Sequence, residues 1–191
     1  QVGSSAASDV YKRQTLMSKL FDLSNKNVLL TGASKGMGLA MAQGLVNHGA
    51  NVVVSSRKLD QCEKAVETIN ESIGKEKAFA FSCNASSKDE LNALVEFSLS
   101  KLGSITTLVC NAGVNSFFGS MSEIDDESYD KTMDTNVKSN HWLINMVTPS
   151  MKESGGGSIM ITSSIAAFHA SETLGTYSIS KLAAVSYTHL R

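Results

Sequence analysis

A glycine-rich turn near the start of the chain has the composition of a phosphate-binding site. It runs from Thr31 to Gly38, follows the apolar run 28–30 and precedes a helical pattern of apolar residues that begins at Leu39. Glycines let the backbone approach a pyrophosphate, and free N–H groups at a helix N-terminus attract its charge. The spacing G-x-x-x-G-x-G differs from the G-x-G-x-x-G of the standard dinucleotide fingerprint. The turn predicts nucleotide binding, and an ordinary tight strand-to-helix turn is the alternative.

A tyrosine and a lysine with helical spacing stand near the other end of the chain. Tyr177 and Lys181 are four residues apart, so a helix would place them on one face, one turn from each other. Tyr-x-x-x-Lys alone does not identify a site, because such a pair also arises by chance. Its position is more informative, since the pair follows Ser164, which lies at the end of the last predicted strand.

Short apolar runs alternate with helical patterns along the whole chain. Strands are predicted at 28–30, 52–54, 78–81, 108–110 and 158–161. Helices are predicted at 39–48, 60–73, 91–99, 126–147 and from 175 onward, and the only proline, Pro149, is expected to end the fourth of them. Short apolar strands separated by helices predict an α/β fold, a Rossmann-like doubly wound parallel sheet with helices on both faces. Ligands should gather at the carboxyl ends of its strands.

The end of the second strand favours a phosphorylated dinucleotide. An NAD site usually has an acid there for the ribose hydroxyls. This chain has Ser56 and Arg57 instead, and Lys35 in the glycine turn can reach the same region. A guanidinium pairs with a phosphate, which a carboxylate would repel. We therefore expect NADP(H) in preference to NAD(H), with a solvated helix start as the alternative for Arg57.

Three further segments follow strand ends or the last strand. Asn84 and Ala85 could contact an adenine edge, although a helix cap is an equal alternative for Asn84. The small residues of Asn111-Ala112-Gly113 leave room for a flat ligand beside the backbone. Candidate substrate-pocket residues lie in the loops beyond, with the core as the alternative for the two aromatic side chains. They are Asn115, Phe117, Phe118 and His169.

Composition excludes several classes of function. Hydrophobic residues make up 42% and charged residues 18% of the 191 residues, and the net charge is −1. A balanced charge gives no reason to expect nucleic acid or a membrane surface as a partner. Cys62, Cys83 and Cys110 lack metal-ligand spacing, so we expect no metal and a reducing, cytoplasmic environment. Residues 17–185 are predicted to form one domain, incomplete at its C-terminal end, between non-native tails at 1–14 and 186–191.

Taken together, these motifs resemble the classical short-chain dehydrogenase/reductases. The resemblance rests on Gly32-x-x-x-Gly36-x-Gly38, Asn111-Ala112-Gly113, Asn136, Ser164 and Tyr177-x-x-x-Lys181, in that order. Asn84 and Cys110 depart from the common pattern, in which Asp and Asn are usual. The runs 114–120 and 158–168 are most similar to NADP-dependent carbonyl and retinol reductases, whose animal members are peroxisomal.

The resemblance implies an oxidoreductase that transfers a hydride between NADP(H) and a small carbonyl or alcohol substrate. Tyr177 would be the acid/base, Ser164 would orient the substrate oxygen, Lys181 would assist Tyr177 and hold the nicotinamide ribose, and Asn136 would keep a water beside the lysine. The implied cofactor-binding residues are Gly32, Ser34, Lys35, Gly36, Met37, Gly38, Ser56, Arg57, Asn84, Ala85, Asn111, Ala112, Gly113, Tyr177 and Lys181. The full-length form is expected to be a homo-oligomer, a dimer or a tetramer.

Two other functions remain open at this point. The chain could be an inactive nucleotide-binding fragment, because family members continue beyond the lysine with parts that complete the sheet and cover the substrate. It could also be an epimerase or dehydratase of the same superfamily that holds its cofactor tightly and produces no net redox change.

Overall fold

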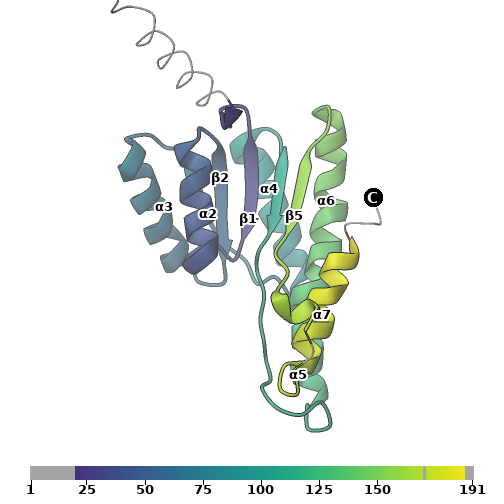
Figure 1. Ribbon diagram of the computed structural model, residues 1–191. Coiled ribbons are helices and arrows are strands. Elements are labelled where there is room, and N and C mark those ends of the chain that lie inside the picture. The colour runs from purple at the N-terminus through teal and green to yellow at the C-terminus, as the bar shows by residue number, and fades with distance from the viewer. Residues whose placement is uncertain (1–19, 170, 188–191) are drawn as a thin grey trace, which may run out of the picture.

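Five parallel strands form one sheet in the computed structural model, which describes residues 20–169 and 171–187. The strands are β1 (Asn27–Thr31), β2 (Asn51–Ser56), β3 (Ala78–Ser82), β4 (Thr107–Cys110) and β5 (Ser158–Ile161). Their order across the sheet is β3-β2-β1-β4-β5. The chain builds outward from β1 to β3 and then crosses to β4, so the topology switches between β1 and β4 (Figure 1). Ligands of doubly wound sheets bind at such a switch point, beyond the carboxyl ends of the strands.

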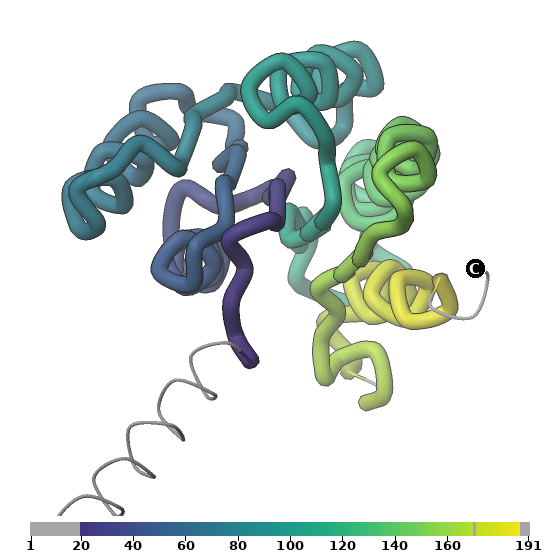
Figure 2. Tube along the Cα trace, turned by 90° about the horizontal axis from the view of Figure 1, so that it is seen from above, coloured from purple at the N-terminus to yellow at the C-terminus, as the bar shows by residue number. Residues whose placement is uncertain are grey.

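Helices cover both faces of the strands β1 to β4, and the predicted fold class is confirmed. The helical segments are α2 (Gly36–Asn47), α3 (Leu59–Ile73), α4 (Lys88–Leu102), α5 (Asp126–Met133), the π-helical η1 (Asp134–Lys138), α6 (Ser139–Glu153), the 3₁₀ turn η2 (Ile165–Ala167) and α7 (Gly175–Ser186). Seen from above, α2 and α3 lie on one side of the sheet and α4 and α6 on the other (Figure 2).

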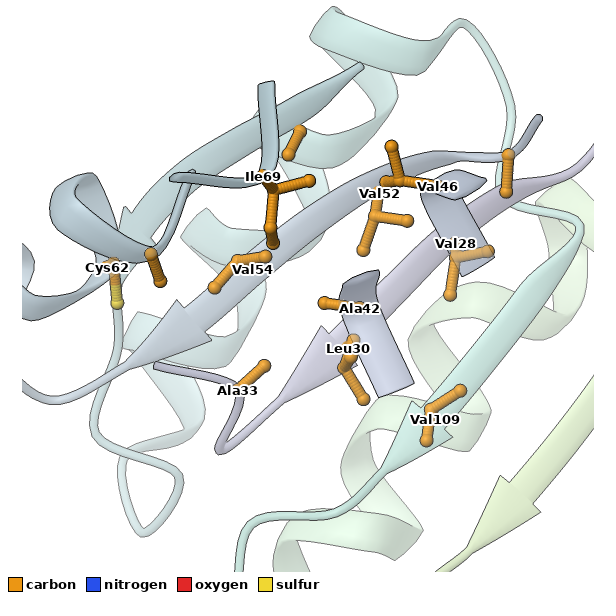
Figure 3. Close-up of a cluster of buried hydrophobic side chains, with 13 residues drawn as sticks. Val28, Leu30, Ala33, Ala42, Val46, Val52, Val54, Cys62, Ile69 and Val109 are labelled. Atoms are coloured by element: carbon orange, nitrogen blue, oxygen red, sulfur yellow. The ribbon is translucent and has the colours of Figure 1, made fainter. Parts of the chain in front are cut away.

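Alternation along the central strands divides the core into two clusters. Val28 and Leu30 of β1 point into the cluster under α2 and α3, whose members Figure 3 shows. Leu29, between them, points into the cluster under α4 and α6. All three side chains are fully buried. Successive side chains of a strand point to opposite faces, so an uninterrupted apolar strand is stable only between two helical layers.

The prediction of helices on both faces does not hold for the last strand, β5. Met160 of β5 is paired in register with Val109 of β4, so its side chain points to the face that α2 and α3 cover elsewhere. It is 48% exposed, because the helices in the described part of the chain do not reach this edge of the sheet. The α7 helix packs instead on η2, α5 and η1, at the carboxyl end of the sheet (Figure 1).

The prediction that Pro149 ends the fourth helix is wrong. The segment is α5, η1 and α6 in succession, and Pro149 lies inside α6, which continues to Glu153. The last turn is held by tertiary contacts, since Met151 is buried and the hydroxyl of Ser150 accepts a hydrogen bond from Ile105 N at 3.3 Å. These contacts stabilise a turn that the local sequence disfavours.

Most of the predicted tails lie outside the described residues, namely 1–14 and 188–191. Ser186 is the last residue of α7, and the hydroxyl of Tyr187 lies 2.6 Å from Nδ1 of His141. The tail assignment therefore stays a prediction. None of the helices in the described part of the chain is long and apolar enough to cross a membrane.

Candidate active site

One large cleft opens at the carboxyl ends of β1, β2, β3 and β4. Its volume is about 1320 Å³, larger than the roughly 300–1,000 Å³ of most small-molecule sites. The predicted cofactor-binding residues that line it are Gly32, Ser34, Lys35, Gly36, Met37, Gly38, Ser56, Arg57, Asn84, Ala85, Asn111, Ala112 and Gly113. The cleft thus brings together four segments that are far apart in the sequence.

The glycine turn has the close backbone packing that its spacing predicts. Gly32 and Gly36 have positive φ angles of 65° and 57°, which favour glycine. A Cβ at Gly38 would lie 2.3 Å from the carbonyl oxygen of Gly32. The first N–H groups of α2, from Gly36 to Gly38, lack helical partners and lie at the cleft. This backbone therefore fits a pyrophosphate.

The side chain of Asn111 forms hydrogen bonds with the backbone of the glycine turn. Its Nδ2 donates to the carbonyls of Gly32 at 2.9 Å and Thr31 at 3.2 Å. Thr31 Oγ1 in turn accepts hydrogen bonds from the N–H groups of Asn111 and Ala112, each at 3.2 Å. The amide of Asn111 thus ties the end of β4 to the glycine turn. Sequence reasoning included Thr31 in the glycine turn but assigned its hydroxyl no role, because the partners of a threonine at a strand end are unknown until the neighbouring strand is known.

Charged side chains line two parts of the cleft. Lys35, Arg57 and Lys58 come from the glycine turn and the end of β2. A second part of the lining, which sequence reasoning did not foresee, comes from α5 and η1 and carries Glu127, Asp130 and Asp134 together with Lys131. Within residues 20–169 and 171–187, neither Lys35 nor Arg57 forms an ion pair. A dianionic group would be attracted to the first part, which carries only cations, more strongly than to the second, which carries both signs of charge.

The end of β3 is held by a modified capping arrangement. Ser87 caps α4 by accepting a hydrogen bond from Glu90 N at 3.3 Å. Glu90 Oε2 accepts from Asn84 N at 2.7 Å instead of returning to the N-cap residue. Asn84 is therefore not the helix cap, and its Oδ1 accepts from Ser86 N at 3.2 Å at the cleft wall.

The side chains of Lys181 and Asn136 lie close together beside Gly113, in the segment that follows β4. Lys181 is 5% exposed, and its Nζ donates to the carbonyl of Thr162 at 2.8 Å. A Cβ on Gly113 would lie 3.1 Å from that Nζ and 3.4 Å from Asn136 Oδ1. The same Nζ lies 5.8 Å from the ring centroid of Tyr177. Burial lowers the pKa of Lys181, because the low-dielectric interior disfavours its charged form.

Asn136 joins two parts of the site. Its Oδ1 accepts from Val114 N, and its Nδ2 donates to Val114 O, both at 2.8 Å. The same Nδ2 donates to Ser180 Oγ of α7 at 2.9 Å, and that hydroxyl donates to Tyr177 O at 2.7 Å. The Asn136 side chain therefore connects the loop after β4 to the helix that carries Tyr177 and Lys181.

Ser164 stands between β5 and η2. Its Oγ accepts a hydrogen bond from Ala166 N at 3.2 Å, so Ser164 caps η2. The preceding Ser163 donates from its Oγ to Lys181 O at 2.8 Å. Two hydrogen bonds therefore join the turn after β5 to α7 at Lys181. The Ser163 side chain donates to the backbone of Lys181, and the Lys181 side chain donates to the backbone of Thr162.

The predicted substrate-pocket residues lie away from the cleft. Asn115, Phe118 and His169 are exposed, and Phe117 packs against Gly119. None of these four side chains lines the large cleft. Their loops do meet, because Gly119 N donates to Thr173 O at 3.1 Å. The role of these residues in a substrate pocket stays a prediction.

The three cysteines are buried as free thiols. Burial raises the pKa of Cys83 and that of Cys110 to about 12, which makes both poor nucleophiles. In the described residues, no group of three or more His, Cys, Asp or Glu side chains could hold a metal ion.

The family model of the short chain dehydrogenases matches residues 26–190. The chain belongs to this family. The human dehydrogenase/reductase SDR family member 4 is 39% identical over 173 residues, which are 90% of this chain and 61% of that protein. The chain thus spans about three fifths of the length of that relative.

Solved structures of the family share the fold. A short-chain dehydrogenase/reductase from Mycobacterium marinum superposes with a TM-score of 0.84 and 31% identity, covering 90% of this chain and 68% of that one. A 7α-hydroxysteroid dehydrogenase in complex with NADH and 7-oxo glycochenodeoxycholic acid gives 0.83 and 34% identity, covering 87% and 64%. The family is named for dehydrogenases, and the second of these structures contains NADH.

Proposed function

We propose that this protein interconverts a carbonyl compound and an alcohol with NADP(H), and that Tyr177 is the acid/base. The observation that carries the proposal is the convergence of Lys181 and Asn136 at Gly113, on the wall of a cleft that the glycine turn also lines. The names of relatives, a dehydrogenase/reductase and a hydroxysteroid dehydrogenase, support the same class of substrate.

The cleft suits a dinucleotide, which when bound would supply or accept the hydride. The N–H groups of Gly36 to Gly38 would bind the pyrophosphate. Lys35 and Arg57 would bind a 2′-phosphate, because both line the cleft and, within the described residues, neither forms an ion pair with an acid. This charge distribution supports a preference for NADP(H), since an NAD(H) site would have an acid at the end of β2.

The chain's own groups would then move a proton and share charge. Tyr177 would donate its phenolic proton to the substrate oxygen in reduction and remove a proton in oxidation. The Lys181 ammonium, one helical turn away, stabilises the deprotonated phenol. Ser164 would donate a hydrogen bond to the developing negative charge on that oxygen. Asn136 would hold the loop after β4 and α7 in the required relation through its three hydrogen bonds.

Tyr177→Phe tests the acid/base role in the protein expressed from its complete open reading frame. Reduction of a panel of ketones and aldehydes would be followed at the nicotinamide absorbance band. We expect kcat to fall by roughly 1,000-fold, while NADPH binding measured by fluorescence is unchanged. Tyr129→Phe is the matched control, because Tyr129 is a surface tyrosine on α5 that does not line the cleft. Retained turnover in Tyr177→Phe would exclude the acid/base role.

The same measurements distinguish the other two functions. A tightly bound cofactor whose absorbance returns to its starting value as product forms would indicate an epimerase or dehydratase. Binding of NADPH without turnover by residues 1–191 expressed alone, beside turnover by the protein from the complete open reading frame, would indicate that the chain is an inactive nucleotide-binding fragment. Sedimentation equilibrium of the same sample tests the expected homo-oligomer.

A further inference from the structure

The helix that carries Asn136 contains one residue more than a regular α-helix would. Between α5 and α6, Ser139 N donates to Asp134 O, five residues back, whereas an α-helix would use Thr135 O, four residues back. Such π-turns are rare and cluster at functional sites. The extra residue rotates everything before it by about 100° relative to α6, because one residue takes that share of a 3.6-residue turn.

Two buried side chains satisfy the carbonyls of this π-turn. The Oγ of Ser139 donates to Thr135 O at 2.6 Å, so the hydroxyl of Ser139 replaces its own displaced N–H. The Nδ2 of Asn140 donates to Asn136 O at 2.7 Å. Ser139 is 1% exposed and Asn140 is 4% exposed, so water cannot take over either bond.

Both carbonyls belong to residues of the site. Thr135 Oγ1 lies 2.7 Å from Ser86 Oγ at the wall of the cleft. Asn136, the next residue, makes its three side-chain hydrogen bonds to the loop after β4 and to α7. The π-turn is what allows the two adjacent residues to reach these partners while α6 keeps its apolar face on the sheet.

We infer that Ser139 and Asn140 are positioning residues, which hold the π-turn and thereby place Asn136 between the loop after β4 and α7. Without the Ser139 hydroxyl, Thr135 O would be buried and unsatisfied, which costs about 1–3 kcal/mol. The nearest remaining donor is Ser139 N, and using it converts the π-turn to an α-turn. That conversion rotates Asn136 away from Val114 and Ser180. The effect on catalysis rests on the proposed function, whereas the effect on Asn136 does not.

The chain contains a matched control for this bond. Ser98 of α4 is fully buried, and its Oγ donates to Leu94 O at 2.7 Å, four residues back, as Ser139 does to Thr135 O. In the regular α-helix α4, however, Ser98 N also donates to Leu94 O. Ser98→Ala therefore removes a buried hydroxyl without depriving a carbonyl of its main donor.

The test compares Ser139→Ala, Ser98→Ala and Ser139→Thr in the protein expressed from its complete open reading frame. Amide exchange of Val114, whose N–H donates to Asn136 Oδ1, reports the position of Asn136 directly. We expect this exchange to accelerate at least tenfold in Ser139→Ala, to be unchanged in Ser98→Ala and to be restored in Ser139→Thr, which keeps a hydroxyl. We expect kcat to fall roughly 100-fold in Ser139→Ala only, as for a small misplacement in an active site.

Asn140→Leu keeps the inference testable if Ser139→Ala does not fold. It removes the amide donor and keeps the branching and the number of side-chain heavy atoms, and we expect the same acceleration of Val114 exchange. Val114 protection equal to that of Ser98→Ala in both variants would overturn the inference. Faster Val114 exchange with an unchanged kcat would uphold the positioning of Asn136 and contradict its use in the proposed function.

Discussion

The alanine substitution of Gly38 is expected to destroy the glycine turn. A Cβ there would lie 2.3 Å from Gly32 O and 2.7 Å from Ala33 Cα. Non-bonded heavy atoms attract best at about 3.5 Å or more, so the turn would have to open by roughly 1 Å. Both neighbours are backbone atoms and cannot rotate away. Overpacking of this kind costs about 3 kcal/mol, and we expect that loss in the free energy of unfolding.

Two other glycines calibrate this prediction. Gly36 has a φ of 57° and no atom within 4 Å of its hypothetical Cβ. Gly36→Ala should therefore lower the free energy of unfolding only by the strain of the left-handed backbone, about 1–2 kcal/mol. Gly44, inside α2, also has no atom within 4 Å and has ordinary helical geometry. Gly44→Ala should stabilise the protein by about 0.5–1 kcal/mol.

Urea unfolding and NADPH titration of the three variants check the reasoning. In Gly38→Ala the opened turn no longer presents its N–H groups to a pyrophosphate. Losing one or two charge-assisted hydrogen bonds of about 1.5–3 kcal/mol each corresponds to an NADPH affinity roughly 100-fold weaker. Gly44→Ala should bind NADPH normally. The steric argument would be refuted if Gly38→Ala had an unchanged free energy of unfolding and an NADPH affinity within about threefold of that of the unsubstituted protein.

Three further predictions concern charge and titration. Arg57→Asp should shift the NADPH-to-NADH ratio of kcat/KM toward NADH by roughly 100-fold, and an unchanged ratio would show that the phosphate is bound elsewhere. Lys181→Met should lack the burial penalty of the ammonium. Because burial lowers the pKa of Lys181 below 10.5, the unfolded chain binds more protons. The stability of Lys181→Met relative to the unsubstituted protein should therefore decline as pH rises toward 10.5, which unfolding at several pH values would measure. Cys110, with its pKa raised to about 12, should resist iodoacetamide in the folded protein at about pH 8, and native-state alkylation seen by mass spectrometry would contradict this.

Local patterns sufficed to predict the sheet and most of the cleft. The strands around residues 28–30, 52–54 and 108–110 are apolar at every position, and only a sheet between two helical layers buries both their faces. Parallel strands bring their carboxyl ends to one edge, so the residues that follow each strand had to converge. The glycine turn, Arg57 and Asn111 were found in this way.

Features that depend on contacts between distant segments could not be predicted. Pro149 locally signals a helix end, yet the burial of Met151 carries α6 beyond it. The carboxylate of Glu90 has the spacing of a capping box, but the end of β3 places Asn84 N within its reach. The part of the cleft that α5 lines has no signal in the sequence, because its residues face the cleft only once the helix has packed beside α7.

The sequence by itself determined the α/β architecture, the glycine turn and the order of the motifs that mark the family. It did so because hydrophobic periodicity and glycine conformations are local properties of a few neighbouring residues. Only the tertiary structure decided that the helix at Asn136 takes a π-turn. The competing α-turn is favourable locally. The π-turn is more stable here because Ser139 and Asn140 donate to its displaced carbonyls inside the core. It also lets Asn136 bond to partners on two other segments.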